Sequence, residues 1–213
     1  MIDQPRSGSP LAFTAWAMLS GAAWSIGSHL LLGPGISDPN QIHTFALDIA
    51  LQAVPTAVLL GAGGAFVLRR FLRNPLLWAA SVLIGLPVGV TVGLLLDAAF
   101  LYRQVHSMGM VLSGEGGTAF MWTSPAIDLT IAGFILAVCQ LPSLARGLAS
   151  RPARAALWVL GTAASLGVGW FLSAALADTS GQSSVWQGAA MGLVSGSLIF
   201  GLLLAMERET SGA

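Results

Sequence analysis

Six apolar stretches alternate with short polar or Gly- and Pro-rich segments along the chain of 213 residues. Each stretch is long enough for one helical crossing, because a hydrocarbon core about 30 Å thick needs about 20 residues of α-helix. The pattern therefore predicts an all-α integral membrane protein with six transmembrane helices in a single polytopic membrane domain, residues 1–213. The expected spans are 11–33, 44–68, 76–101, 123–145, 155–177 and 186–206.

Arginines distinguish the two sides of these predicted spans. With six crossings, eight of the nine basic residues fall on one side and only Arg103 falls on the other. Cytoplasmic segments of membrane proteins carry an excess of Lys and Arg, so both termini are expected in the cytoplasm, and we expect a bacterial inner membrane. The eight residues on the cytoplasmic side are Arg6, Arg69, Arg70, Arg73, Arg146, Arg151, Arg154 and Arg208.

Composition supports a membrane protein and excludes several functions. Hydrophobic residues make up 55% of the chain and charged residues only 8%, whereas a soluble domain carries about 25% charged residues. The formal net charge is zero, so no basic surface favours nucleic acid. Cys139 is the only cysteine, which excludes a disulfide within the chain and a metal site built on several cysteines.

A weak internal repeat relates alternate spans. Spans 1, 3 and 5 each carry Trp followed after ten residues by Gly. Spans 2, 4 and 6 each begin near a polar residue and end at arginine. The pattern predicts three diverged two-helix hairpins, although Trp and Arg also gather at the interfaces of unrelated membrane proteins. The matching pairs in spans 1, 3 and 5 are Trp16 and Gly27, Trp78 and Gly89, and Trp158 and Gly169.

Small residues recur at every fourth position on several predicted helices. Such a face lets two helix backbones approach closely, which favours association in lipid. The principal interpretation is tight packing within one chain, and the alternative is contact with a second copy or with partner membrane subunits. The glycines predicted to serve packing are Gly27, Gly85, Gly89, Gly93, Gly169, Gly188, Gly192 and Gly196.

Polar residues near the outer ends of the spans are the candidate functional residues, because ionisable groups within membranes commonly mark functional sites. Together they predict a shallow outward-facing vestibule for a substrate. The alternative places them at headgroup depth, where they only orient the helices; Asp128, for example, follows Ser124 and Pro125 and resembles the start of a helix. The candidates are Asp48, Asp97, Asp128, Arg103, Gln187 and His29.

One short segment before the predicted fourth span raises the possibility of a metal site. His106, Met108 and Met110 offer imidazole and thioether ligands, which suit Cu(I). The segment is too short and too common in composition to establish a metal, so we expect no cofactor. The chain contains none of the HExxH, GxSxG or GxxxxGK[ST] motifs, and we do not expect an enzyme.

Three functional classes remain, of which a membrane-embedded enzyme that acts on lipid is the least favoured. A small transporter is favoured by the repeat, the internal prolines and the outer polar residues. In outline, six spans with a long outer loop between spans 3 and 4 resemble the substrate-binding membrane subunit of a multi-component vitamin or metal importer. The alternative is a non-catalytic structural or accessory subunit of a larger membrane complex, favoured by the small-residue faces and by the lack of charge in the middle of the spans.

The predicted topology can be tested by cysteine labelling in intact cells. Single cysteines replacing Ser7, Ser150 or Ser211 should resist a membrane-impermeant thiol reagent, because all three positions are expected in the cytoplasm. A cysteine replacing Ser113 should react, and a Cys139→Ala background removes the native thiol. Labelling of Ser150→Cys from outside the cell would contradict the six-span arrangement.

Overall fold

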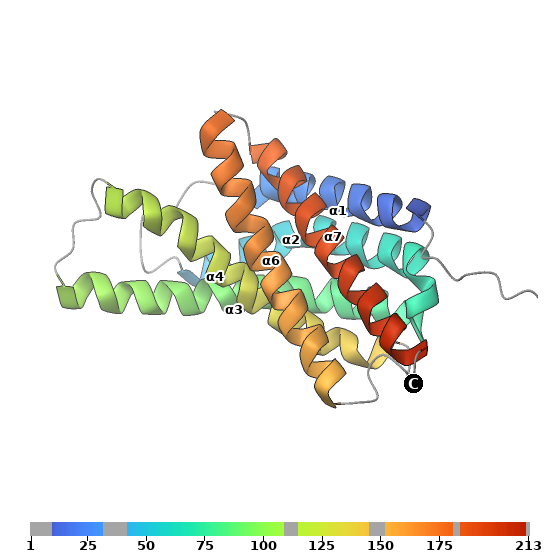
Figure 1. Ribbon diagram of the computed structural model, residues 1–213. Helices are drawn as coiled ribbons and strands as arrows, with labels where there is room; N and C mark the ends of the chain where they lie inside the picture. Colours follow the sequence, from blue (N-terminus) through green and yellow to red (C-terminus); the bar gives the residue numbers. More distant parts are fainter. Residues whose placement is uncertain (1–9, 32–41, 109–114, 145–151, 181–183, 212–213) are drawn as a thin grey trace, which may run out of the picture.

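The computed structural model describes residues 10–31, 42–108, 115–144, 152–180 and 184–211 of the chain. This part forms six long α-helices and two short 3₁₀ turns (Figure 1). In the described ranges the only β-type pairing is an isolated bridge between Leu72 and Leu144. The elements are α1 (Pro10–Leu31), α2 (Ile42–Val67), η2 (Arg69–Phe71), α3 (Pro75–Met108), α4 (Glu115–Gln140), η3 (Leu141–Ser143), α6 (Pro152–Ser180) and α7 (Ser184–Ser211).

Five of these helices are long and apolar enough to cross a membrane, namely α2, α3, α4, α6 and α7. All six helices also expose large apolar side chains, among them Leu11, Phe66 and Leu76, which are 81%, 73% and 82% exposed. Apolar faces of this extent on every helix are expected where lipid rather than water surrounds the protein. The fold is therefore that of a multi-pass helical membrane protein.

The first helix is not among these five, although a span was expected at 11–33. The structure describes its side chains only over residues 10–26, which is shorter than the 18 residues of such a span. Trp16, Ser20 and Trp24 of this helix are buried inside the protein. A crossing by α1 therefore stays a prediction.

The outer ends of α3 and α4 differ from the prediction. A long loop was expected between spans ending at 101 and beginning at 123, but α3 continues to Met108 and α4 begins at Glu115. The helix start expected at Ser124 and Pro125 is therefore wrong, because both residues lie inside α4. Proline destabilises a helix least in its first turn, and for this reason Ser124 and Pro125 suggested a helix start. In the structure the chain is already helical at these residues. Figure 1 shows these two helix ends extending to the left of the other helices.

The six helices form a closed ring in which each one packs against its neighbours in sequence. The contacts run from α1 to α2, α3, α4, α6 and α7, and α7 returns to pack against α1. The first and last helices pack against each other as extensively as the other neighbouring pairs do, so the ring is closed. Figure 1 shows α6 and α7 crossing the others obliquely. Every helix therefore has one edge facing the centre of the ring.

A glycine lies at each of the six contacts around the ring. A Cβ atom added to Gly89 would come within 2.8 Å of the Cα and carbonyl oxygen of Ala132, and one added to Gly192 would overlap the carbonyl oxygen of Ser20. Backbones this close leave no space for a side chain. In order from α1–α2 to α7–α1, the contacts are Gly63 with Leu19, Gly61 with Ala79, Gly89 with Ala132, Gly133 with Ala163, Gly169 with Ser195, and Gly192 with Ser20.

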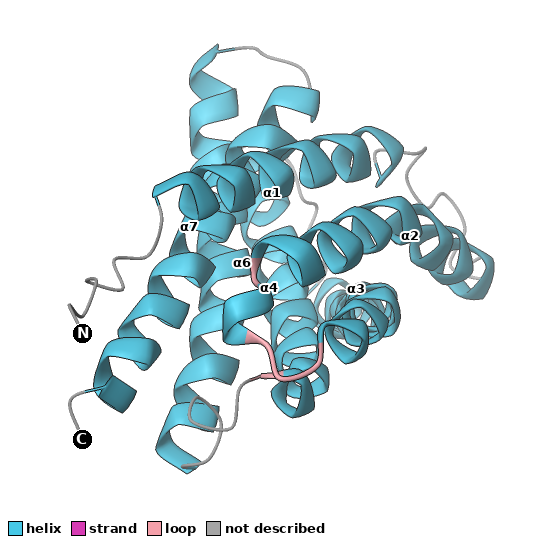
Figure 2. Cartoon of the chain, turned by 90° about the vertical axis from the view of Figure 1, so that its right-hand side faces the viewer, coloured by secondary structure: helices cyan, strands magenta, loops and turns pink. Residues whose placement is uncertain are grey.

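The connections that carry the arginines meet at one end of the ring. The backbone N–H of Arg73 donates a hydrogen bond to the carbonyl oxygen of Ser143 at 2.7 Å, which joins the α2–α3 connection to the segment after α4. Figure 2 looks onto this end, with the two loops in pink near its centre. Arg70 forms an ion pair of 3.4 Å with Glu207 near the end of α7. Arg69, Arg70, Arg73 and Arg154 thus mark one end, called here the arginine end.

The glycine contact between α3 and α4 can be tested with a single methyl group. Gly89→Ala should lower the free energy of unfolding by about 1–3 kcal/mol, because the added carbon must push two backbones apart. Gly201→Ala is the matched control, since nothing lies within 4 Å of the added Cβ atom. Thermal unfolding in detergent measures both variants. If Gly89→Ala unfolds at the same temperature as Gly201→Ala, the close contact with Ala132 is wrong.

Candidate functional site

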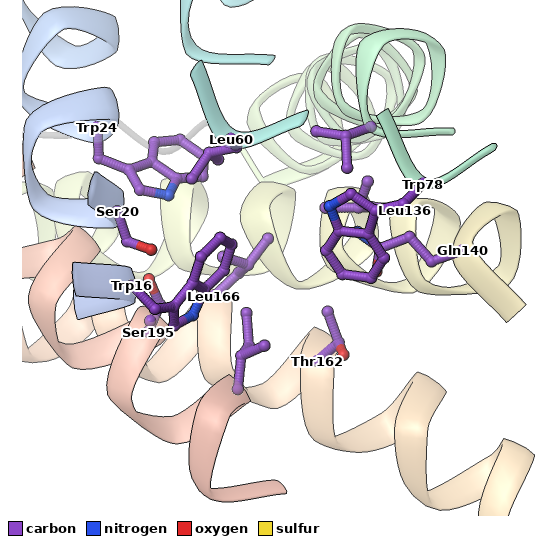
Figure 3. A pocket seen from close by; sticks show the side chains of 13 residues that line it. Trp16, Ser20, Trp24, Leu60, Trp78, Leu136, Gln140, Thr162, Leu166 and Ser195 are labelled. Carbon is purple, nitrogen blue, oxygen red and sulfur yellow. The ribbon is translucent and has the colours of Figure 1, made fainter. Parts of the chain in front are cut away.

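A small cavity lies at the centre of the ring, and all six helices contribute to its wall (Figure 3). Its volume is about 30 Å³, which is enough for one or two water molecules. None of the thirteen residues in the wall is charged. They are Trp16, Ser20 and Trp24 from α1, Leu60 from α2, Trp78 and Val82 from α3, Leu136 and Gln140 from α4, Thr162 and Leu166 from α6, and Ser195, Gly196 and Ile199 from α7.

Among the residues that the structure describes, five side chains in this wall bury a polar atom with no hydrogen-bond partner, and so do Gln52, Trp158 and Trp170 outside the wall. The five in the wall provide two indole N–H groups, two hydroxyl groups and one amide oxygen. Each of these residues is at least 97% buried. A buried polar group that forms no hydrogen bond costs roughly 1–3 kcal/mol, so five of them around one small space need a common explanation. The residues are Trp16, Ser20, Trp78, Gln140 and Thr162.

Two glycines provide the space in which these polar atoms lie. A Cβ atom at Gly196 would stand 2.7 Å from the Ser20 hydroxyl and 3.6 Å from the Trp16 indole nitrogen. A Cβ atom at Gly64 would stand 2.7 Å from the Trp78 indole nitrogen and 3.0 Å from the six-membered ring of Trp16. Both indole nitrogens therefore lie against a helix backbone that carries no side chain. The cavity depends on glycine at these positions as well as on the polar residues.

The tryptophans of spans 1, 3 and 5 come together inside the ring. Trp78 and Trp158 lie with ring centroids 6.2 Å apart, and Gly64 contacts both Trp78 and Trp16. All three rings are nearly fully buried, although Trp in membrane proteins is enriched at the interfaces. The repeat analysis selected these three residues, but it did not predict that they face the centre. Ser20 and Thr162 were missed, although hydroxyl groups on small-residue helix faces were a usable signal.

The cavity extends toward the arginine end, away from the end where the acidic vestibule was expected. Gln140 is the last residue of α4 and Trp78 lies in the first turn of α3, and both of these helix ends adjoin the connections at the arginine end. Asp48 lies in the first half of α2, far from the arginine end, and Asp128 lies near the middle of α4. The wall of the cavity contains none of the residues predicted for the vestibule.

The two acidic residues predicted to act together differ in burial. Asp48 is exposed on α2. Asp128 is half-buried on α4, with its backbone against Gly93 of α3. A half-buried carboxylate is more costly than an exposed one. Asp128 is therefore the stronger candidate for a functional acid.

The remaining predicted residues are placed as follows. Gln187 is half-buried on α7. Asp97 and Arg103 belong to α3 and His29 to α1, but their side chains lie outside the described residues, so the vestibule stays a prediction. The same holds for the side chains of His106 and Met108 and for Met110 as a whole. Within the described ranges, no three His, Cys, Asp or Glu residues lie together as a metal site would require.

The predicted packing glycines mostly face neighbouring helices of the same chain. Gly85, Gly89 and Gly93 lie against α4, Gly169 lies against α7, and Gly192 and Gly196 lie against α1. Gly188 is buried on α7, while the surroundings of Gly27 lie outside the described residues. A separate groove of about 410 Å³ runs along the outside between α4 and α6 and is almost entirely apolar. Its open, apolar wall suits lipid chains and offers no polar chemistry.

Comparison of the chain with protein families, with curated proteins and with solved structures finds no match. The functional argument therefore depends on the geometry and chemistry of the described residues.

The difference between Asp48 and Asp128 predicts different effects of neutralisation. Asp128→Asn should change the free energy of unfolding by about 1 kcal/mol, because a half-buried carboxylate interacts with protein groups as well as with water. Asp48→Asn should stay within about 0.5 kcal/mol of the unchanged protein, as exposed substitutions usually do. Thermal unfolding and any transport assay should be run on both variants. Loss of transport in both variants with normal folding would instead favour the outer acidic vestibule.

Proposed function

We propose that this protein is a small transporter that moves a small solute through the centre of the helix ring. The observation that carries the proposal is the convergence of all six helices on one small cavity with five buried polar side chains in its wall. Transport sites of membrane proteins commonly lie near the middle of the bilayer between packed helices. A purely structural bundle gains nothing from five buried polar groups that lack partners.

The proposed arrangement has six crossings, with α1 as the first span, packed against α2 and α7. The arginine end faces the cytoplasm of a bacterial inner membrane, together with both termini. Three two-helix hairpins, α1–α2, α3–α4 and α6–α7, arose from a common repeat. This proposal is supported by the spacing of Trp and Gly that α1, α3 and α6 share.

A binding subunit of a multi-component importer is the variant of this proposal that places the substrate at an outer vestibule. An accessory subunit of a larger complex is the alternative. The small-residue faces that favoured a partner subunit are largely used inside the ring, where they contact neighbouring helices. This use of the glycines favours the transporter, because fewer close-packing faces are left for another chain.

The test is solute flux into liposomes that contain the purified protein. Wild-type protein should raise the flux of at least one small polar solute several-fold over protein-free liposomes. Gly196→Ala should remove most of that increase, because the methyl group enters the cavity beside Ser20 and Trp16. Gly201→Ala should transport as the wild type does. Flux equal to that of protein-free liposomes for every solute would contradict transport and favour the accessory subunit.

A further inference from the structure

We infer that the central cavity binds a small uncharged molecule that both donates and accepts hydrogen bonds, of the size of water or ammonia. The transport role of this molecule rests on the proposed function, for which the inference names the class of solute. The binding site itself follows from the cavity alone. The juxtaposition that defines it is a set of five buried polar groups without protein partners around one small cavity.

The polar groups specify the hydrogen-bonding character of the ligand. The indole N–H groups of Trp16 and Trp78 are donors only, so each needs a lone pair from the ligand. The amide oxygen of Gln140 is an acceptor, so it needs an N–H or O–H group. The hydroxyls of Ser20 and Thr162 serve either role. The site therefore suits a molecule that combines a lone pair with N–H or O–H hydrogens.

The absence of charge in the wall argues against ions. None of the thirteen wall residues is charged, and transferring an unpaired ion from water into such surroundings costs several kcal/mol. The wall contains no carboxylate that would pair with a cation and no basic group that would pair with an anion. An uncharged molecule avoids this penalty.

The size of the cavity limits the ligand further. A volume of about 30 Å³ holds one or two molecules of water size. Gly196 sets this limit on the α7 side, because an added Cβ atom there would lie 2.7 Å from the Ser20 hydroxyl. A solute as large as glycerol requires the helices to separate. The ring as it stands therefore admits only the smallest polar molecules.

Occupancy is tested by nuclear magnetic resonance on the full-length protein in lipid nanodiscs with ¹⁵N-labelled indole groups. The Trp16 and Trp78 resonances are assigned by Trp16→Phe and Trp78→Phe, and both indole protons should show cross-peaks to water. Gly196→Ala should weaken the Trp16 cross-peak several-fold, while Gly201→Ala should leave it unchanged. Absence of water cross-peaks from both indoles in the wild type would overturn the site.

Stability gives a second measure that does not depend on resonance assignment. If the hydroxyl of Thr162 is hydrogen-bonded to a ligand, Thr162→Val should raise the unfolding equilibrium constant roughly fivefold, because the valine keeps the volume and loses only the hydroxyl. If the cavity is dry, removal of this buried hydroxyl should instead raise the unfolding temperature. Thr130→Val is the matched control, because Thr130 is exposed. Stabilisation by Thr162→Val would overturn the site.

The solute class is tested separately from occupancy with proteoliposomes. Osmotic shrinkage followed by light scattering reports water, and an internal pH-sensitive dye reports ammonia. An increase in either flux that Gly196→Ala removes supports the inference. An increase in sodium, potassium or chloride flux that the same variant removes would overturn the uncharged class. Indole–water cross-peaks without any flux would support the binding site and contradict the transport function.

Discussion

The close approach of helix backbones at glycine is the constraint on which the rest of the structure depends. Lipid tails are as apolar as leucine, so apolar side chains gain little by leaving lipid for a neighbouring helix. Association must come from contact between backbones, which a side chain at the interface prevents. Five of the six contacts in the ring bring a glycine against the backbone of the neighbouring helix, including the contact at Gly192 where the last helix meets the first. At the sixth, between α1 and α2, Gly63 instead makes room for the side chain of Leu19.

The same glycines determine what the ring encloses. Gly64 and Gly196 carry no side chain, and residues of neighbouring helices occupy the space. The rings of Trp78 and Trp16 lie against Gly64, and Ser20 and Trp16 lie against Gly196. Large rings from one helix thus fill the space beside glycine on another, and only about 30 Å³ remains open. The tryptophans carry their N–H groups inward with them. Buried N–H groups inside this ring therefore follow from the packing of tryptophan side chains against glycine on a neighbouring helix.

The functional proposal follows from the lack of charge at this centre. A central cavity without charged groups does not suit ion-coupled transport, which commonly uses acidic residues inside the membrane. It suits small neutral molecules, for which hydrogen bonds replace those lost from water. Asp128 is half-buried near the middle of α4, outside the cavity wall. Any part that Asp128 takes in transport would therefore concern access to the cavity rather than binding within it.

Sequence alone determined the helical membrane class, because a run of about 20 apolar residues has one stable form in lipid. It also selected Trp16, Trp78 and Trp158 as related positions and most of the packing glycines. The boundaries near Met108 and Glu115 were missed, because helix extension beyond the apolar core leaves no hydropathy signal. Only the tertiary structure decided that the tryptophans face inward and that Ser20, Gln140 and Thr162 meet them. A helix that is apolar on most faces does not reveal from its own sequence which face meets lipid, and that choice depends on contacts between residues far apart in the chain.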